Sequence, residues 1–366
     1  MSIVGAISGE PLLGPGLLLR AAGHGAAWPG TDVRLFSRAR HALASYLEVV
    51  GLARGTLYVP AYICAEAVAG LGMDGPSVRY YPVGRDLTPD WAWLAGRKFG
   101  DRDSLLLVHY FGFPNDVDRA LELCHDRGLH LIEDCAHSFL TTHGGKVIGT
   151  FGDAGVYAYH KLLPIPDGAG LVRRSSLGTD ALGPERSAGL AEGRAIARQL
   201  VKFGIYRMGL ARLLLYGARR NGHDSAANTV SGSGRGISGA SVRLLRALAG
   251  DFGGIVARRR DNYRSLAAAF QDSPGVAPLF PDLEDGVCPY AFPVEVESRN
   301  EVINRLRGEG VAAYRWPDLP SEVSGSSDYP DANRLASRVM LLPVHQDIGP
   351  KDIARIVDAY SRACPA

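Results

Sequence analysis

Between residues 36 and 175, short apolar runs alternate with stretches whose apolar residues recur at helical spacing. The helical spacing predicts helices at 40–52, 65–73 and 116–128, and the short runs predict strands at 56–64, 78–83, 104–111, 129–136, 152–161 and 169–174. Strands that alternate with helices of this length indicate an α/β domain with a largely parallel sheet. Ligands bind at the carboxyl ends of the strands in such sheets, so residues that directly follow an apolar run are the first candidates for a site.

The pattern changes after residue 175. A basic amphipathic stretch at 194–220 is followed by a segment rich in Gly and Ser. Beyond it, the spacing predicts a helix at 241–270 with a break near Gly253-Gly254, a strand at 290–297, a helix at 300–310 and a last helix from about Pro350. We therefore expect a large α/β domain over 1–250, with a helical insertion at about 176–235, and a smaller C-terminal α+β domain over 251–366.

Composition narrows the class of protein. The chain has 366 residues, which suits a large and a smaller domain, and 46% of them are hydrophobic, which excludes a disordered chain. Lys and Arg number 40 against 38 Asp and Glu, so a net charge of +2 removes bulk electrostatics as an argument for nucleic-acid binding. Only five of the 40 basic residues are lysines, so an enzyme that uses a lysine has few candidates.

Cysteine spacing and the apolar runs bear on location. The five cysteines are widely spaced without a CxxC motif, which fits neither a disulfide framework nor a zinc site. No apolar run reaches the roughly 18 residues that a transmembrane helix needs, and the first residues lack the basic start of a signal peptide. We expect a cytoplasmic protein without a metal centre.

The sharpest local feature lies at residues 129–138. An apolar run ends there in Glu133-Asp134, and His137 follows three positions later. Acidic residues at a strand end can simply cap the following helix. They can also place an acid at a ligand site, because ligands bind at this end of a strand.

Lys161 directly follows another apolar run, 27 residues after Asp134. Pro164, Pro166 and Gly168 then exclude a regular helix and predict an irregular loop. The neighbouring apolar residues are expected to bury this lysine, and burial lowers the pKa of an amine. A lysine with a lowered pKa is a nucleophile for carbonyl groups and forms Schiff bases.

An Asp and a Lys at adjacent strand ends indicate pyridoxal 5′-phosphate (PLP) as the cofactor. PLP needs an imine-forming lysine and a carboxylate that keeps its pyridine nitrogen protonated. It also needs a phosphate site, which the N-terminus of a helix supplies well. Residues 37–40 open the first predicted helix and offer such a site, although Ser37 is also an ordinary N-cap residue.

Several segments, taken in order, resemble the DegT/DnrJ/StrS family of PLP-dependent aminotransferases, which share fold type I. The resemblance covers about 33–175 and 236–360. The matching segments are Arg38–Leu43, Val59–Tyr62, Val108–Gly112, Glu133–His137, Gly149–Ala154 and Leu342–Asp347.

The resemblance assigns roles to five residues. By it, Asp134 pairs with the pyridine nitrogen, His137 lies beside the ring, and Lys161 forms the internal aldimine. The amides of Ala39 and Arg40 bind the phosphate. The resemblance also implies the fold type I architecture, a large domain with a mainly parallel sheet plus a smaller C-terminal domain, and a homodimer.

The chain departs from the family pattern at the phosphate site. Many members carry a Ser in an S-x-H-x-x-K segment, whereas this chain reads Tyr157–Lys161 with Ala158 at the Ser position. The family's N-x-R segment is missing before Ser238. Arg40 and Ser238 are the candidates to replace the lost phosphate donors.

The residues and the resemblance together predict a PLP-dependent aminotransferase of small-molecule biosynthesis. It would move an amino group from a donor to a keto or aldehyde acceptor, for which a nucleotide-linked keto sugar is the candidate, with Lys161 as general acid and base. One alternative is a PLP-dependent lyase, dehydratase, aldolase-type or β/γ-replacement enzyme on an amino acid. A second is a non-catalytic binding protein on the same scaffold.

Further residues are candidates for contact with the substrate. They are Tyr62, His109, Tyr110, Arg315, Trp316 and His345, and simple packing at a strand end is the alternative for His109 and Tyr110. The basic stretch at 194–220 suits a packing or subunit-interface helix. Recognition of an anionic substrate, of an acidic carrier protein or of a membrane surface are its alternatives.

Overall fold

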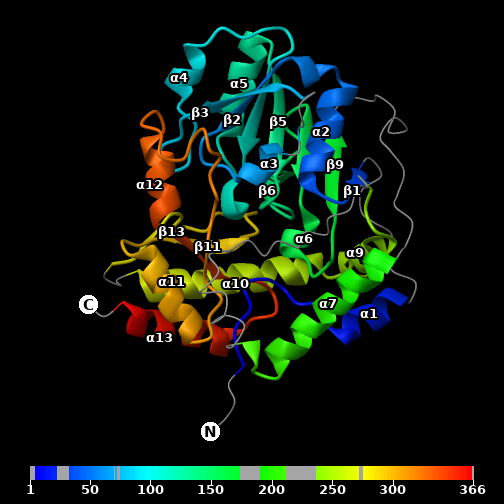
Figure 1. Cartoon of the computed structure of the whole chain (residues 1–366), viewed down its shortest axis with the longest axis vertical. Coiled ribbons are helices and arrows are strands. Elements are labelled where there is room, and N and C mark those ends of the chain that lie inside the picture. The colour runs from blue at the N-terminus through cyan, green and yellow to red at the C-terminus, as the bar shows by residue number, and fades with distance from the viewer. Residues whose placement is uncertain are drawn as a thin grey trace.

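Figure 1 shows the computed structural model of the chain. It describes residues 5–22, 33–69, 71, 75–173, 190–211, 236–271 and 275–364. The upper part of the picture is a sheet with helices packed on it, and helices α7, α10, α11 and α13 lie below it.

The large sheet has seven strands in the order β1-β9-β8-β5-β4-β2-β3. Their bounds are β1 Val33–Phe36, β2 Thr56–Pro60, β3 Ser77–Tyr81, β4 Ser104–Val108, β5 His130–Cys135, β8 Ala154–Tyr157 and β9 Ala169–Arg173. The five strands from β3 to β8 pair in parallel, whereas β9 runs antiparallel to both β8 and β1. The predicted α/β class with a largely parallel sheet is therefore confirmed.

Helices connect and cover these strands. Their bounds are α2 Ala39–Val49, α3 Ala65–Ala69, α4 Trp91–Ala95 and α5 Val117–Arg127, with short 3₁₀ turns η1 Leu52–Arg54 and η2 Tyr110–Gly112. The helix α5 has clear end signals. The Asp116 carboxylate accepts a hydrogen bond from the Arg119 amide at 3.1 Å, and Gly128 ends the helix with φ 67°. A two-stranded ribbon, β6 Thr142–His143 and β7 Lys146–Val147, follows β5.

The segment around Lys161 differs from its prediction. The strand expected over 152–161 ends at Tyr157, and the lysine lies in a one-turn helix, α6 Tyr159–Leu162. The helix does end before the prolines, because Leu163, which precedes Pro164, has extended backbone. The turn therefore displaces Lys161 from the strand itself to the first helical turn after it.

A second sheet of four antiparallel strands lies in the C-terminal part of the chain, in the order β10-β11-β13-β12. Its strands are β10 Ala277–Pro278, β11 Ala291–Glu295, β12 Tyr314–Arg315 and β13 Val339–Pro343, and its helices are α11 Arg299–Gly308, α12 Pro330–Arg338 and α13 Pro350–Ala363. Every residue of β13 is buried. The predicted strand at 290–297 and the last two predicted helices are all present; the boundary between domains at 250 stays a prediction.

The helix expected over 241–270 is two helices, α9 Gly239–Ala249 and α10 Phe252–Phe270. The break falls at Gly250-Asp251, where Gly250 ends α9, and not at Gly253-Gly254 as predicted. Two glycines are tolerated there because they occupy the first turn of α10, where the amides lack helical partners.

The predicted insertion at 176–235 is described only over residues 190–211. There α7 spans Leu190–Arg207, and the remaining residues of the insertion lie outside the described part of the chain. Near the N-terminus, α1 covers Pro15–Ala22 and packs on α9. None of the helices in the described ranges combines the length and apolar character needed to cross a membrane.

One prediction concerns the contact between β8 and the turn before it. A Cβ on Gly155 would lie 2.1 Å from the Gly149 carbonyl oxygen, so Gly155→Ala must displace that backbone. We expect a loss of about 1–3 kcal/mol in the free energy of unfolding, measured with urea. The matched control, Gly193→Ala in α7, meets no atom within 4 Å and should gain about 0.5–1 kcal/mol. Equal stability of the two variants would contradict this packing.

Candidate functional site

A cavity of about 400 Å³ lies at the carboxyl ends of β4, β5 and β8. Its wall combines the first turn of α2, α6, part of α7 and the residues around β12. Eight of the residues that the sequence singled out line it, namely Ala39, Arg40, His109, Asp134, His137, Lys161, Arg315 and Trp316.

Lys161 and His137 meet inside this cavity. The Lys161 Nζ lies 3.0 Å from the His137 Nε2. Burial lowers the pKa of the Lys161 amine, and the negative charge of Asp134 opposes this only in part. Burial, together with the positive charge of Lys161, holds the pKa of His137 well below its usual value. Both shifts favour neutral groups, and a neutral amine is the form that attacks a carbonyl carbon.

Asp134 faces the same cavity from the end of β5. Burial raises the pKa of its carboxyl group, whereas the charge of Lys161 and a hydrogen bond from the Ala136 amide, 2.9 Å long, work against this rise. Asp134 is thus a carboxylate with one fixed hydrogen bond and a free side toward the cavity, which suits it to bind a protonated ring nitrogen.

Aromatic rings hold His137 in place. Its ring stacks on Tyr290 with centroids 4.5 Å apart and an interplanar angle of 2°, and Phe111 stacks at 5.6 Å and 12°. Trp316 meets the imidazole edge-on at 4.9 Å. Three aromatic contacts leave the imidazole little freedom to turn, so the direction of its hydrogen bond to Lys161 is fixed.

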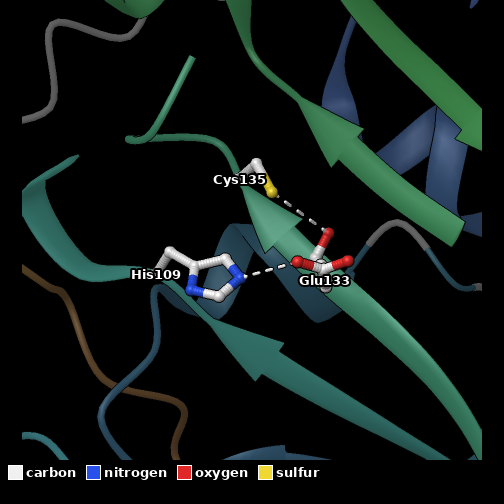
Figure 2. Close-up of side chains that lie close together, drawn as sticks. All are labelled: His109, Glu133 and Cys135. Atoms are coloured by element: carbon white, nitrogen blue, oxygen red, sulfur yellow. Dashed lines mark hydrogen bonds and ion pairs between the residues drawn. The ribbon is translucent and has the colours of Figure 1, made fainter. Parts of the chain in front are cut away.

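Glu133, the neighbour of Asp134, points away from the cavity because alternate side chains of a strand face opposite sides. Its carboxylate is fully buried and accepts hydrogen bonds from the amides of Gly149, Phe151 and Gly152, each 2.8 Å long. A fourth donor is His109 Nε2 at 3.2 Å (Figure 2). The site acid Asp134 is therefore anchored through its neighbour to the turn before β8.

The partners of His109 define which of its nitrogens carries the proton. Its Nδ1 accepts a hydrogen bond from the Asn115 amide at 3.0 Å, so the proton lies on Nε2, which donates to Glu133. Figure 2 also shows Cys135, whose Sγ contacts the Glu133 carbonyl oxygen at 3.8 Å. His109, Glu133 and Cys135 have the residue types of metal ligands, but their ligand atoms are already engaged in these hydrogen bonds.

The N-terminus of α2 supplies the cationic end of the cavity. Arg38 is its N-cap residue with extended backbone, and no side chain caps the helix there. Burial lowers the pKa of the Arg38 guanidinium; the negative charge of Asp167 opposes this effect, and the positive charge of Arg40 adds to it. Uncapped amides at a helix N-terminus beside two arginines form a binding site for an anion such as phosphate.

Four predicted site residues lie elsewhere. Ser238 caps α9, donates to the Asp167 carboxylate at 2.6 Å and does not line the cavity; its role as a phosphate donor stays a prediction. Tyr62 and Tyr110 pack behind Trp316, since the Tyr62 hydroxyl donates to the Trp316 carbonyl oxygen at 2.8 Å and Tyr110 to that of Tyr62 at 2.7 Å. They support the wall rather than form it.

His345 is the fourth. Its Nδ1 accepts from the Asp347 amide at 3.3 Å, and its Nε2 contacts the Ser8 carbonyl oxygen at 2.9 Å. Both ring nitrogens therefore have protein partners, and His345 is not part of the cavity lining. His345 links its own segment to the N-terminal one, and a contact with the substrate stays a prediction.

The cavity also has lining residues that the sequence analysis missed. Glu10 pairs with Lys202 of α7, and both line the cavity together with Tyr206 and Arg307. The negative charge of Glu10 adds to burial in raising the pKa of Tyr206 to about 12. Lys202 carried one usable signal, as a lysine within an arginine-rich stretch. Glu10 carried none, because residues around it form no regular element.

These groups fit PLP. Lys161 offers an amine for the aldehyde, Asp134 a carboxylate for the ring nitrogen, and the first turn of α2 a phosphate site, all in one cavity. The fold and cavity thus define an α/β protein with the donor set of a PLP-binding protein.

Comparison with known proteins leads to the same class. The model of the DegT/DnrJ/EryC1/StrS aminotransferase family matches residues 100–173 and 210–361, more than half of the chain. The chain belongs to this family, and the resemblance seen in its sequence is confirmed.

Two curated relatives carry the names of sugar aminotransferases. The dTDP-4-dehydro-2,3,6-trideoxy-D-glucose 4-aminotransferase of Saccharopolyspora spinosa is 27% identical over 283 residues, which covers 71% of this chain and 65% of that protein. The dTDP-3-amino-3,4,6-trideoxy-alpha-D-glucose transaminase of Micromonospora megalomicea subsp. nigra is 27% identical over 273 residues, covering 70% and 64%. The chain thus matches slightly less than two thirds of the length of each.

Solved structures share the fold over almost the whole chain. The aminotransferase TlmJ from Streptoalloteichus hindustanus aligns with a TM-score of 0.71 and 20% identity, over 98% of this chain and 99% of that one. The sugar aminotransferase CalS13 from Micromonospora echinospora aligns with a TM-score of 0.67 and 19% identity, over 98% and 100%. The predicted fold class is therefore confirmed.

The buried carboxylate of Glu133 generates a prediction about acid stability. Burial alone favours its neutral form, but the hydrogen bonds from His109 and the backbone outweigh this and lower its pKa below the ordinary 4.5. A carboxyl group with a lowered pKa stabilises the fold above its unfolded pKa, and this contribution is lost as the pH falls through the folded value. Glu133→Gln should thus lower the unfolding free energy at pH 7 by about 2 kcal/mol or more.

The difference in unfolding free energy between Glu133→Gln and wild type should be smaller at a pH below the folded pKa of Glu133, which is itself below 4.5, than at pH 7, because the native carboxylate is then protonated. Urea unfolding at both pH values measures it. Glu122→Gln, a change of an exposed residue on α5, is the matched control and should have little effect at either pH. If the loss of unfolding free energy in Glu133→Gln were the same at both pH values, the hydrogen bonds to Glu133 would not depend on its negative charge.

Proposed function

We propose that this protein is a PLP-dependent aminotransferase that transfers an amino group to a keto or aldehyde acceptor, with a nucleotide-linked keto sugar as the preferred one. The observation that carries the proposal is the meeting of Lys161, His137 and Asp134 in one cavity beside the uncapped start of α2. The family supports the reaction, and the names of the two dTDP-sugar relatives support the acceptor.

PLP, when bound, supplies an electron sink that stabilises negative charge on the carbon next to the substrate nitrogen. The residues of the chain bind and orient it and move the proton. Asp134 holds the ring nitrogen, and the amides of Ala39 and Arg40 with the Arg38 guanidinium hold the phosphate. The Lys161 Nζ, with its lowered pKa, would take a proton from the substrate carbon that bears the nitrogen and return it two atoms away, on the other side of that nitrogen.

His137 orients the lysine during this transfer. Its Nε2 lies at hydrogen-bond distance from Lys161 Nζ. Because its pKa is well below the ordinary value, the imidazole is a weak base and does not take the proton from the lysine. The aromatic groups around it, Tyr290 and Trp316, exclude water from that side of the cavity.

The acceptor would occupy the part of the cavity near α7. Glu10, Lys202, Arg307 and Arg315 give this part charges of both signs, which suits a ligand with hydroxyl groups and an anionic portion. Under this proposal α7 is a substrate-binding helix, in agreement with one of the alternatives weighed for the basic stretch. A cytoplasmic homodimer completes the proposal.

One prediction from the proposed function concerns Lys161. Lys161→Ala should abolish transamination and the visible absorbance of bound PLP, because no other lining amine takes its place next to Asp134. Absorbance titration with PLP and coupled assay of amino transfer measure both. The control, Lys146→Ala, removes an exposed lysine on β7 and should leave both intact.

Adding an amino donor alone separates the proposed reaction from its main alternative. An aminotransferase should lose the visible absorbance of the bound cofactor and keep the donor's nitrogen, whereas a lyase or replacement enzyme regains the absorbance after turnover. Full recovery of the absorbance without any acceptor would contradict the proposal.

A further prediction concerns the phosphate of PLP. Arg38→Ala should weaken the binding of PLP by about tenfold or more, because a charge-assisted contact to phosphate is lost. Pyridoxal, which lacks the phosphate, should bind wild type and variant equally. Titration of both compounds decides: an equal loss for pyridoxal would mean that Arg38 supports the fold of the cavity and does not hold the phosphate.

A further inference from the structure

The polar residues of the segment Leu342–Asp347 contact two different parts of the chain that border the cavity. His345 contacts the Ser8 carbonyl oxygen at 2.9 Å, and the Asp347 carboxylate accepts from the Leu12 amide at 2.7 Å. These two bonds fix the N-terminal segment that carries Glu10. The third residue, Gln346, turns the other way and donates from Nε2 to the Leu162 carbonyl oxygen at 3.1 Å.

The Leu162 carbonyl has a second donor. Arg259 of α10 donates to it from Nη2 at 3.0 Å, and its Nε donates to the Gln346 Oε1 at 2.9 Å. Leu162, Gln346 and Arg259 therefore form a closed triangle of hydrogen bonds. Arg259 is only 1% exposed, so its bond to the Leu162 carbonyl is made away from water, whereas Gln346 is half-buried.

Leu162 directly follows Lys161 and is the last residue of the one-turn helix α6. An isolated turn of helix is not stable in water, and its last carbonyl groups have no partners within it. A guanidinium and an amide on the last carbonyl satisfy it, and the positive charge suits the negative end of the helix. The position of Lys161 thus depends on Arg259 and Gln346, which lie about 100 and 180 residues away in sequence.

The same guanidinium also reaches the other side of the lysine. Arg259 Nη1 donates to the carbonyl oxygens of Pro289 and Tyr290 at 3.0 and 3.1 Å. The Tyr290 ring stacks on His137, the partner of Lys161. One buried arginine therefore holds both ends of the hydrogen bond between Lys161 and His137.

We propose that Arg259 and Gln346 are positioning residues that fix α6, and with it the Lys161 amine, against His137. Neither residue lines the cavity, so they act through Leu162 and Tyr290 and not on the substrate. The catalytic meaning of this proposal rests on the proposed function, but the hydrogen-bond triangle can be tested without it.

The test is amide hydrogen exchange on the full chain without cofactor, read by mass spectrometry. The reporters are the amides of Lys161, Leu163 and Ile165, which donate within this turn at 3.1, 2.9 and 2.8 Å. In Gln346→Leu and in Arg259→Met we expect their exchange to rise by about tenfold or more, while β4 and β5 exchange as in wild type.

Arg258→Ala is the matched control, because it removes the same charge from the next position of α10, where the side chain is half-exposed and pairs with Asp251. Its exchange should match wild type throughout. If Arg259→Met does not fold, Gln346→Leu alone decides. Unchanged exchange around Lys161, or a rise of the same size in β4 and β5, overturns the proposal.

A second readout separates this proposal from the proposed function. If the chain binds PLP, Gln346→Leu should slow capture of PLP by Lys161 and shift its pH dependence, because the amine is no longer fixed against His137. A raised exchange rate in Gln346→Leu, together with a wild-type protein that does not bind PLP, would leave the triangle established and the proposed function wrong. Normal exchange with normal PLP capture overturns the positioning role alone.

Discussion

The burial of one carboxylate shapes the site more than any group that faces the cavity. Glu133 has no access to water, and a buried charge costs several kcal/mol unless donors surround it. Three backbone amides and His109 meet that need, and each draws a separate segment onto the end of β5. Because a strand alternates its side chains, the same backbone then has to present Asp134 to the cavity. The position of Asp134, which faces the cavity, is therefore set by Glu133, which does not.

Much of this was predictable from local patterns. Apolar runs of strand length and the spacing of apolar positions predicted the parallel sheet, and the rule for strand ends brought Asp134 and Lys161 together from 27 residues apart. The order of the motifs predicted the family. Prediction failed where the cause is not local. The turn of helix at Tyr159–Leu162 depends on the distant Arg259 for its last carbonyl, and no short window of sequence contains that partner.

The residues whose roles differed show what a motif does not contain. His345 lies in a segment typical of the family, so a substrate contact was a reasonable expectation, yet both of its nitrogens bind backbone. Ser238 is a suitable residue type for a phosphate donor, but in this chain its hydroxyl donates to Asp167. In both cases a polar side chain found a partner in the protein, which only the tertiary structure reveals. Conversely, Lys202 belongs to the cavity because α7 packs close to the N-terminal segment.

The triangle of Leu162, Arg259 and Gln346 has a consequence for how the chain acquires its site during synthesis. All strands of the large sheet have left the ribosome well before Gln346 is made, so the sheet can assemble while the Leu162 carbonyl still lacks one of its two donors. A chain synthesised only as far as β13 therefore carries Lys161 on a turn whose last carbonyl has Arg259 as its one side-chain donor. The support of the lysine is completed only when the Gln346 amide reaches that carbonyl.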